Sequence, residues 1–167
     1  RLGGARRWWL HHSIAVLDRD LREKGAPLIL RRGSTVRQLL ELAEQTSATT
    51  VYATRSLEPW ARTLEVELQR RLTERGIELK LFPGSTLLAP EEIHSKSGHP
   101  LTIYAAFRRA ISSRDVPTPQ PAPAKMPSPA DLPISDRLDD WQLLPRSPDW
   151  AHGLRETWVP GEHAALA

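Results

Sequence analysis

Short apolar runs alternate with amphipathic helical segments along the first half of the chain, and this alternation limits the fold more than any other feature. The first segment is a helix whose apolar residues recur every three or four positions, at Leu10, Ile14, Leu17 and Leu21. Apolar or β-branched runs follow at residues 28–30, 50–53 and 77–81, each separated from the next by another helical pattern. Strands joined by helical crossovers form a parallel sheet with helices on its faces, so we predict an α/β fold.

The third helix of this pattern indicates how the sheet is wound. Pro59 suits the first turn of a helix, and four apolar residues then step in fours toward Gly76: Trp60, Leu64, Leu68 and Leu72. The pattern opens on a helix, so we expect at least one strand before Arg1. We therefore predict a Rossmann-like doubly wound parallel sheet followed by an irregular proline-rich tail. Such a sheet binds ligands at the carboxyl ends of its strands.

A proline-rich stretch divides the chain into regions. Seven prolines lie between Pro117 and Pro133, a density that excludes helix and sheet interior and favours extended chain. We expect an α/β domain over residues 1–114, whose last helix covers 104–111. A semi-rigid linker should follow over 115–135, and a connector toward a further domain over 136–167.

The composition excludes several classes of protein. There is no cysteine, which excludes disulfides, thiolate nucleophiles and cysteine-bound zinc. No apolar run reaches the roughly 18 residues that a membrane span needs. The start at Arg1 shows no secretory signal pattern, and we expect a fragment of a cytoplasmic protein. The net charge of +3 is ordinary for a protein without a nucleic-acid partner.

No catalytic motif is recognisable. The glycines form no phosphate-binding loop, and no serine lies in a nucleophile elbow. His11 and His12 are neighbours, so on a helix their side chains point about 100° apart and do not readily share a metal. We predict no catalytic residue and no metal site. Trp8 and Trp9 are expected to place one ring in the core and leave the other partly exposed.

Several segments resemble the photolyase/cryptochrome family, in the order and at the spacing of that family. The helix start from Gly4 to Ile14 resembles the opening of the family's second main helix. Val51-Tyr52, followed after five residues by Glu58-Pro59-Trp60, resembles a family strand and the helix after it. The segment from Tyr104 to Ala110 resembles the loop that ends the α/β domain, and the tail with Leu143-Leu144-Pro145 resembles the connector to the second domain. The chain is thus similar to the N-terminal α/β domain and interdomain linker, truncated at both ends.

The resemblance implies a function for the parent protein. Family members carry an antenna pigment, a folate or a deazaflavin, in the α/β domain, and bind FAD and UV-damaged DNA in a helical C-terminal domain. It implies a fragment of a light-driven, FAD-dependent carbon–carbon lyase, a deoxyribodipyrimidine photolyase that splits pyrimidine dimers. The parent would be monomeric, would have no membrane partner and would act on damaged DNA through the absent domain. The fragment alone is predicted to be inactive.

Two residues of this chain carry the antenna expectation. Arg6 and Glu58 occupy positions that contact the pigment in members that use a deazaflavin, and Ser56 lies where an acidic residue is usual. Folate-using members have a carboxylate at the position of Ala61, so folate is the less favoured pigment. The alternative interpretation is that Arg6 is a surface charge and Glu58 a carboxylate that favours the start of its helix.

Other interpretations stay open. The resemblance also fits a cryptochrome-like blue-light photoreceptor, because the distinguishing residues lie in the absent domain. A third reading is a non-catalytic nucleotide- or pigment-binding module, suggested by the substitutions at Ala53, Ala105 and Ala106. The tail tryptophans either dock the tail on the α/β body or contact the absent domain and remain partly exposed; they are Trp141, Trp150 and Trp158.

Overall fold

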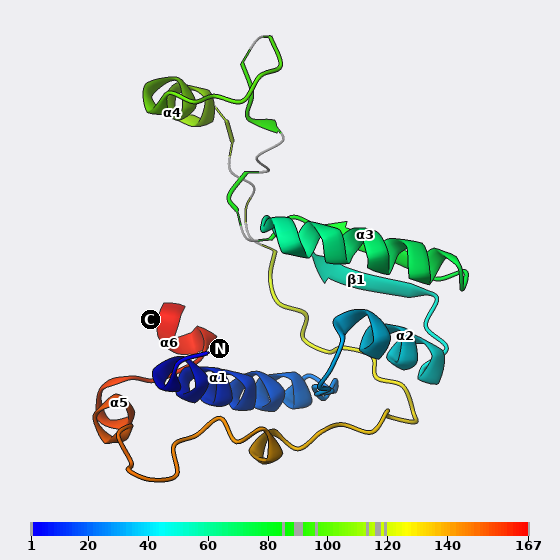
Figure 1. Cartoon of the computed structure of the whole chain (residues 1–167), viewed down its shortest axis with the longest axis vertical. Helices are drawn as coiled ribbons and strands as arrows, with labels where there is room; N and C mark the ends of the chain where they lie inside the picture. Colours follow the sequence, from blue (N-terminus) through cyan, green and yellow to red (C-terminus); the bar gives the residue numbers. More distant parts are fainter. Residues whose placement is uncertain are drawn as a thin grey trace. The chain divides into compact units, whose positions relative to one another are not determined.

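The computed structural model describes residues 2–84, 86–88, 92–95, 97–112, 114–115, 118 and 120–166. The elements named in Figure 1 are α1 (Gly4–Glu23), α2 (Thr35–Gln45), β1 (Thr50–Thr54), α3 (Pro59–Thr73), β2 (Glu78–Phe82), α4 (Tyr104–Ser112), η2 (Leu138–Trp141), α5 (His152–Thr157) and α6 (Glu162–Leu166). The chain forms two compact units. The first comprises Arg1–Gln38 with Ala122–Ala167, and the second comprises Leu39–Pro121.

Helix α1 is the main helix of the first unit, and it confirms the predicted first helix. It runs for 20 residues and ends where Gly25 takes a positive φ of 91°. That conformation lets the N–H of Gly25 donate to the carbonyl of Arg22 at 3.0 Å, which closes the last turn. Trp8 is the buried residue of α1, with 1% of its surface exposed.

The predicted strand at residues 28–30 is wrong, because this segment is irregular in the structure. The N–H of Leu28 donates to Oδ1 of Asp18 at 3.0 Å, and the N–H of Leu30 donates to Oγ of Ser135 at 2.9 Å. The carbonyl of Leu30 accepts from the N–H of Asp136 at 2.8 Å. Helix α1 and the tail therefore satisfy backbone groups that a neighbouring strand would bond in a sheet.

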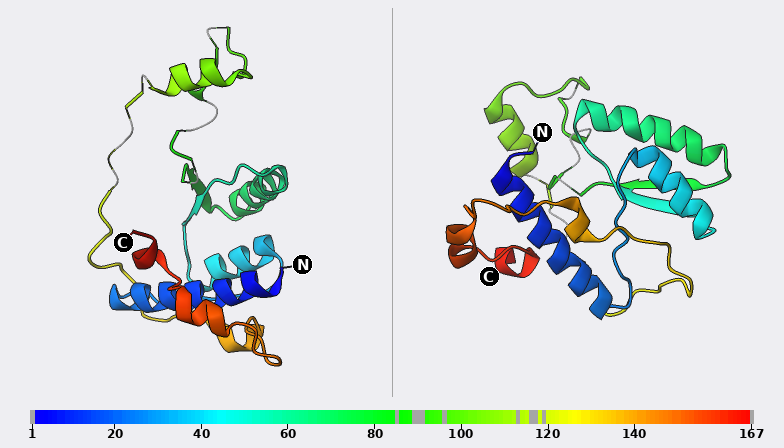
Figure 2. Two further views of the ribbon diagram at one scale, coloured as in Figure 1. Left: turned by 90° about the vertical axis from the view of Figure 1, so that its left-hand side faces the viewer. Right: turned by 60° about the horizontal axis from the view of Figure 1, so that its bottom comes forward.

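The tail returns along α1 in the first unit, as the yellow, orange and red segments of Figures 1 and 2 show. Its start is held by Lys24, whose carbonyl accepts from the N–H of Met126 at 2.8 Å and whose Nζ donates to the carbonyl of Pro123 at 3.0 Å. The described residues between 115 and 135 form no helix or strand. Within the first unit, this proline-rich chain is thus fastened to the end of α1.

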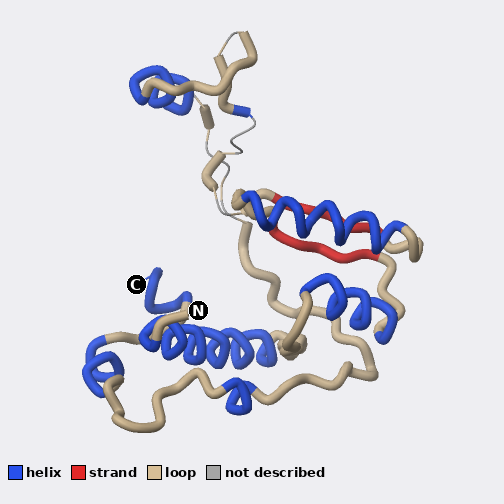
Figure 3. The backbone as a smooth tube through the Cα atoms, in the orientation of Figure 1, coloured by secondary structure: helices blue, strands red, loops and turns tan. Residues whose placement is uncertain are grey.

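The second unit is built on a parallel pair of strands. β1 and β2 pair from Thr50 opposite Glu78 to Thr54 opposite Phe82, and α3 packs against β2. Figure 3 shows the two strands in red beside α3. The side chains that the strands and α3 bury include Leu68, Leu72, Ile77 and Leu79. The predicted strands at residues 50–53 and 77–81 are therefore confirmed, and they form a small parallel sheet.

Helix α3 confirms the predicted helix start but corrects its apolar face. Pro59 lies in the first turn as predicted. Trp60, predicted on the apolar face, is 70% exposed, whereas Ala61 is buried. A step of four residues overshoots one turn by about 40°, so a line drawn in fours drifts around the helix. Ala61 and Leu68 are seven residues apart and stay on the buried side.

Helix α4 confirms the predicted last helix of the α/β region, with one residue more at its end. The described chain is an α/β structure with a small parallel sheet. Among the helices that it contains, none has both the length and the apolar character required to cross a membrane.

Candidate functional site

The carboxyl ends of both strands meet the loop that leads into α3. The N–H of Arg55, one residue past β1, donates to the carbonyl of Phe82 at 2.9 Å. After β2 the chain passes close to Thr54, and a Cβ added to Gly84 would lie 2.5 Å from Thr54 Cγ2. Only glycine allows this approach, which keeps the two strand ends together at the sheet edge where α/β proteins bind ligands.

Glu58 lies in this loop, at the N-cap position of α3. Its backbone is extended, with φ −68° and ψ 137°, and its carbonyl accepts from the N–H groups of Ala61 at 3.0 Å and Arg62 at 3.1 Å. The exposed carboxylate accepts a hydrogen bond from the hydroxyl of Ser56. That hydrogen bond, followed by one from its own backbone N–H, holds the pKa of Glu58 below its usual value. Glu58 is therefore a stable anion that can accept further hydrogen bonds from solvent or a ligand.

Glu65 lies in α3 and binds the loop through its carboxylate, a role for which the sequence has no local pattern. The N–H of Ser56 donates to Oε1 of Glu65 at 2.9 Å. Glu58 and Glu65 are seven residues apart, and that spacing places residues on the same side of a helix. Ser56 is consequently held by one carboxylate at its hydroxyl and by another at its backbone.

Arg6 lies in the first turn of α1, in the first unit, and its side chain is exposed. It makes no hydrogen bond or ion pair with another residue of the described chain. A cation gains nothing from the positive end of a helix, so the guanidinium is open to an anion from solution. Arg6 and Glu58 belong to different units, and each is characterised in its own surroundings.

Tryptophans gather where the tail covers α1. Trp8 is buried and Trp9 is partly exposed, as predicted. The rings of Trp9 and Trp158 meet edge to face with centroids 6.0 Å apart. The ring of Trp150 lies against Gly4, where an added Cβ would come within 2.7 Å of it. In the first unit, α1 thus holds the tail through aromatic contacts.

The tail tryptophans dock within the first unit, and contact with a further domain stays a prediction. Trp141 is half-buried, donates its indole N–H to Oδ2 of Asp136 at 3.2 Å, and lies 5.3 Å from the guanidinium carbon of Arg32. Trp150 and Trp158 contact α1, yet both remain exposed. These two rings therefore combine an anchoring contact with an open surface.

His12 lies in α1, where its surroundings shift the pKa of its imidazole. Its ring centroid is 4.5 Å from that of Trp8. Burial, followed by the nearby His11 and Arg155, lowers the pKa of His12 below its usual value. Within the described ranges, no three His, Asp or Glu side chains come together as a metal site.

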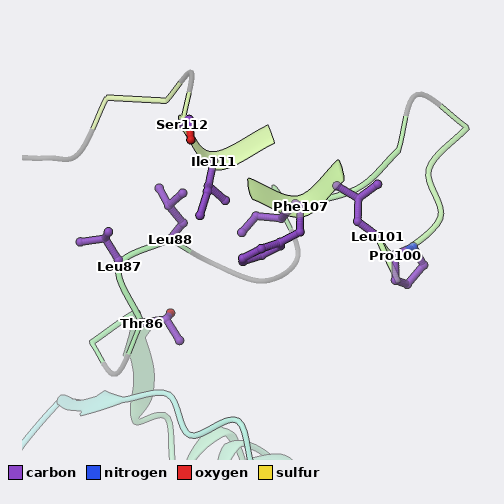
Figure 4. Close-up of a pocket in the computed structure, with 9 residues that line it drawn as sticks. Thr86, Leu87, Leu88, Pro100, Leu101, Phe107, Ile111 and Ser112 are labelled. Atoms are coloured by element: carbon purple, nitrogen blue, oxygen red, sulfur yellow. The ribbon is translucent and has the colours of Figure 1, made fainter. Parts of the chain in front are cut away.

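A pocket of about 570 Å³ lies in the second unit, between α4 and the segments at 86–88, 93 and 100–101. Figure 4 shows its largely apolar lining, which includes Leu87, Leu88, Leu101, Phe107 and Ile111. The described lining contains two hydroxyl side chains but no acid, base or cation. The pocket can accommodate an apolar group, and these residues provide no catalytic chemistry.

Comparisons with known proteins identify the family of this chain. The sequence model of the DNA photolyase family matches residues 1–127. The chain belongs to the DNA photolyase family. It is 38% identical over 166 residues to a deoxyribodipyrimidine photo-lyase of Agrobacterium fabrum, and 31% identical over 165 residues to cryptochrome-1 of Arabidopsis thaliana. The alignments cover 99% and 90% of this chain.

Solved photolyase-family structures have the same fold. A bacterial class III photolyase from Agrobacterium tumefaciens superposes with a TM-score of 0.92 and 37% identity over 98% of this chain. A cryptochrome from Synechocystis gives a TM-score of 0.72 and 27% identity over 86%. The chain spans about a third of the photo-lyase and a quarter of the cryptochrome that it matches in sequence, at 35% and 24% of their lengths.

Proposed function

We propose that this chain is the antenna-chromophore domain of a light-driven, FAD-dependent deoxyribodipyrimidine photolyase that repairs UV-induced pyrimidine dimers. The observation that carries the proposal is the likeness to the Agrobacterium class III photolyase, at 37% identity and a TM-score of 0.92. The cryptochrome likenesses are weaker in both measures, which favours repair over signalling. The catalytic chemistry belongs to FAD and to a helical domain outside residues 1–167, so the fragment alone is inactive.

The domain boundaries belong to the same proposal. Residues 1–114 are the α/β domain, 115–135 the linker and 136–167 the connector to the helical domain. In the parent, further strands extend the small sheet into a Rossmann-like doubly wound one. The parent is monomeric and cytoplasmic, and it binds damaged DNA through its helical domain.

Arg6 and Glu58 are the antenna contacts in this proposal. An ionised carboxylate at the carboxyl edge of the sheet can accept a hydrogen bond from a deazaflavin, and an open guanidinium can donate one to it. Both side chains are exposed, and Glu58 is kept anionic by Ser56. Folate does not fit as well, because Ala61 is a buried apolar position in α3 and offers no carboxylate.

A repair assay on the full-length product of the gene tests the function. We expect bound FAD and light-dependent loss of pyrimidine dimers from a UV-irradiated oligonucleotide. Bound FAD without repair would favour the cryptochrome-like photoreceptor, and a longest product without FAD would favour the non-catalytic module. The 167-residue chain itself, purified in the dark, should show no flavin absorbance, and stoichiometric flavin would contradict an FAD site outside it.

Fluorescence titration of the chain with a deazaflavin tests the antenna site. Glu58→Gln and Arg6→Gln should each weaken binding about tenfold, because each removes a charge-assisted hydrogen bond. Ser56→Asp should tighten binding by restoring the acidic residue usual at that position. Glu67→Gln, at an exposed position on α3, is the matched control and should bind as the parent sequence does. Equal affinity in all variants would remove Arg6 and Glu58 from the site.

A further inference from the structure

Residues 149–158 of the tail, which we call the docking segment, follow one side of α1 within the first unit. The ring of Trp150 lies against Gly4, where an added Cβ would come within 2.7 Å of it. Gly4 and His12 are eight residues apart, which places them on nearly the same side of the helix, about two turns from each other. Arg155 lies close enough to His12 for its charge to act on the imidazole. The docking segment thus meets α1 near both ends of this row.

His12 is the titratable group of α1 in this contact. It is half-buried, and its ring centroid is 4.5 Å from that of Trp8, which is 1% exposed. The two charges that act on it are those of Arg155 and of His11, whose ring centroid is 5.3 Å away. The first is positive and the second becomes so in acid. A proton on His12 therefore adds a charge to a half-buried position that already has like charge beside it.

The carboxylates of the docking segment are bound to other groups. Asp149 accepts hydrogen bonds from the guanidinium of Arg155. That contact holds the pKa of Asp149 below its usual value, so this carboxylate stays ionised in mild acid. Glu156 pairs with His152 at 3.3 Å inside α5. Asp149 therefore offsets part of the charge of Arg155, and neither carboxylate forms an ion pair with His12.

The tail before the docking segment adds one charge of each sign near α1. Asp139 and Arg146 line a pocket of about 100 Å³ together with His11. The described lining of that pocket does not include His12. Because these two charges oppose each other, the like charges of His11 and Arg155 decide how His12 responds to acid.

We propose that the docking segment is a pH-sensitive contact, which stays on α1 while His12 is neutral and which mild acid releases locally while α1 remains folded. In the released form, water hydrates the charged imidazole and Arg155 can move away from it. Release also removes the support of α5, whose six residues are too few for a stable helix in water. The proposal concerns contacts within the first unit and does not rest on the proposed function, so its failure would leave the repair proposal untouched.

The direction of the pH dependence follows from the two forms of His12. Burial, followed by His11 and Arg155, lowers the pKa of His12 in the docked form. In the released form the pKa of the imidazole returns to its ordinary value of about 6.5, so the released form binds the proton more readily. Docking is therefore firm above about pH 6.5 and weakens as the pH falls below that value.

Amide exchange of the purified chain, followed by NMR at about pH 7.5 and about pH 5.5, measures the release. The N–H groups of Arg155 and Trp158 report on α5, where they donate to the carbonyls of Ala151 at 3.1 Å and Leu154 at 2.9 Å. Their protection factors should fall at least about threefold in acid, whereas those within α1 should stay high. A parallel loss of protection in α1 would mean that the whole unit unfolds, and would contradict a local release.

Substitutions at His12 test whether its charge causes the release. His12→Gln is neutral at both pH values and should remove the acid effect, whereas His12→Lys is charged at both and should give low protection of α5 throughout. His163→Gln is the matched control in the same unit, because His163 Nε2 lies 3.5 Å from Asp20 Oδ2 and the side chain is 82% exposed. This control should keep the acid effect. An acid effect that persists in His12→Gln overturns the proposal.

Two variants that break the same ion pair separate the charge of Arg155 from its role in holding the segment. Arg155→Gln removes the cation near His12 and should reduce the acid effect. Asp149→Asn leaves that cation without its counter-charge and should increase the acid effect. If the pair only holds the docking segment in place, both variants would change the acid effect in the same direction. That result overturns the proposal, and so does a protection of α5 that is independent of pH in the parent sequence.

Discussion

Trp8 in the first unit and the aromatic pair of the sheet in the second differ strongly in their exposure. In the first, the ring of Trp8 is 1% exposed. In the second, Tyr52 and Phe82 stack with centroids 6.1 Å apart on the sheet face away from α3, and are 65% and 53% exposed. Within the first unit, Trp9, Trp150 and Trp158 remain partly exposed, so the deep burial belongs to Trp8. Within the second unit, α3 packs against β2, and the rings of Tyr52 and Phe82 lie on an exposed part of the sheet.

The largest effect that tests this contrast is the loss of Trp8. Trp8→Ala should lower the free energy of unfolding of the first unit by about 3–5 kcal/mol, because it removes a fully buried aromatic side chain and leaves a cavity. Denaturant unfolding followed by tryptophan fluorescence measures the change. Trp9→Ala, next to it but partly exposed, should cost about 1 kcal/mol. Equal losses in both variants would mean that the difference in burial does not set the contributions of these two rings.

A smaller loss is expected where the tail crosses α1 at Gly161. This residue has a φ of 122°, and a Cβ added to it would lie 2.8 Å from Cγ1 of Val16. Gly161→Ala should therefore destabilise the first unit by about 1–3 kcal/mol in the same unfolding experiment. Gly153→Ala, within α5 and with open space around it, should stabilise by about 0.5–1 kcal/mol. A neutral Gly161→Ala would show that α6 is not packed on α1.

The stability of the first unit should also depend on pH through His12. Its pKa is lowered in the folded state by burial, His11 and Arg155, so the unfolded chain binds its proton more readily. The contribution of the neutral imidazole is present above the unfolded pKa of about 6.5 and is lost as the pH falls toward the folded pKa. Unfolding free energies measured from neutral to acid pH should show this loss, and His12→Gln should reduce it. His99→Gln, in the second unit, should leave the slope of the first unit unchanged.

The sequence predicts α1, α3, α4 and the strand pair because their patterns are local, whereas the tail was predicted to be irregular and contains the short helices η2, α5 and α6. The leucine spacing of α1, the proline of α3 and the alternation in β2 each depend on neighbouring residues. The segment at 28–30 has the same apolar character as a strand, but hydrogen bonds to Asp18 and Ser135 decide its conformation. Ser135 lies far away in sequence, and no local pattern could point to it.

Part of the candidate site can be expected from the sequence, and part of it depends on the folded structure. Glu58 is a candidate through the resemblance to pigment-contacting positions of the family, and its side chain is exposed in the loop after β1. Glu65 was missed because its carboxylate matters through a backbone N–H, which carries no signature in the sequence. For the tail tryptophans Trp141, Trp150 and Trp158 the sequence favours neither docking on the α/β body nor contact with a further domain, since docking depends on contacts across the length of the chain.

The smallest expected effect concerns the second unit, at the carboxyl ends of its strands. Ser56→Ala removes the hydroxyl that donates to Glu58, so the pKa of Glu58 should rise toward its ordinary value, which carboxyl NMR titration detects. The backbone N–H of Ser56 still reaches Glu65, so the loop should keep its position and the free energy of unfolding should barely change. Glu65→Gln is the complementary variant, because it weakens the hold on the loop and leaves the Ser56 hydroxyl in place. If the pKa of Glu58 does not move in Ser56→Ala, solvent rather than Ser56 governs the ionisation of this exposed carboxylate.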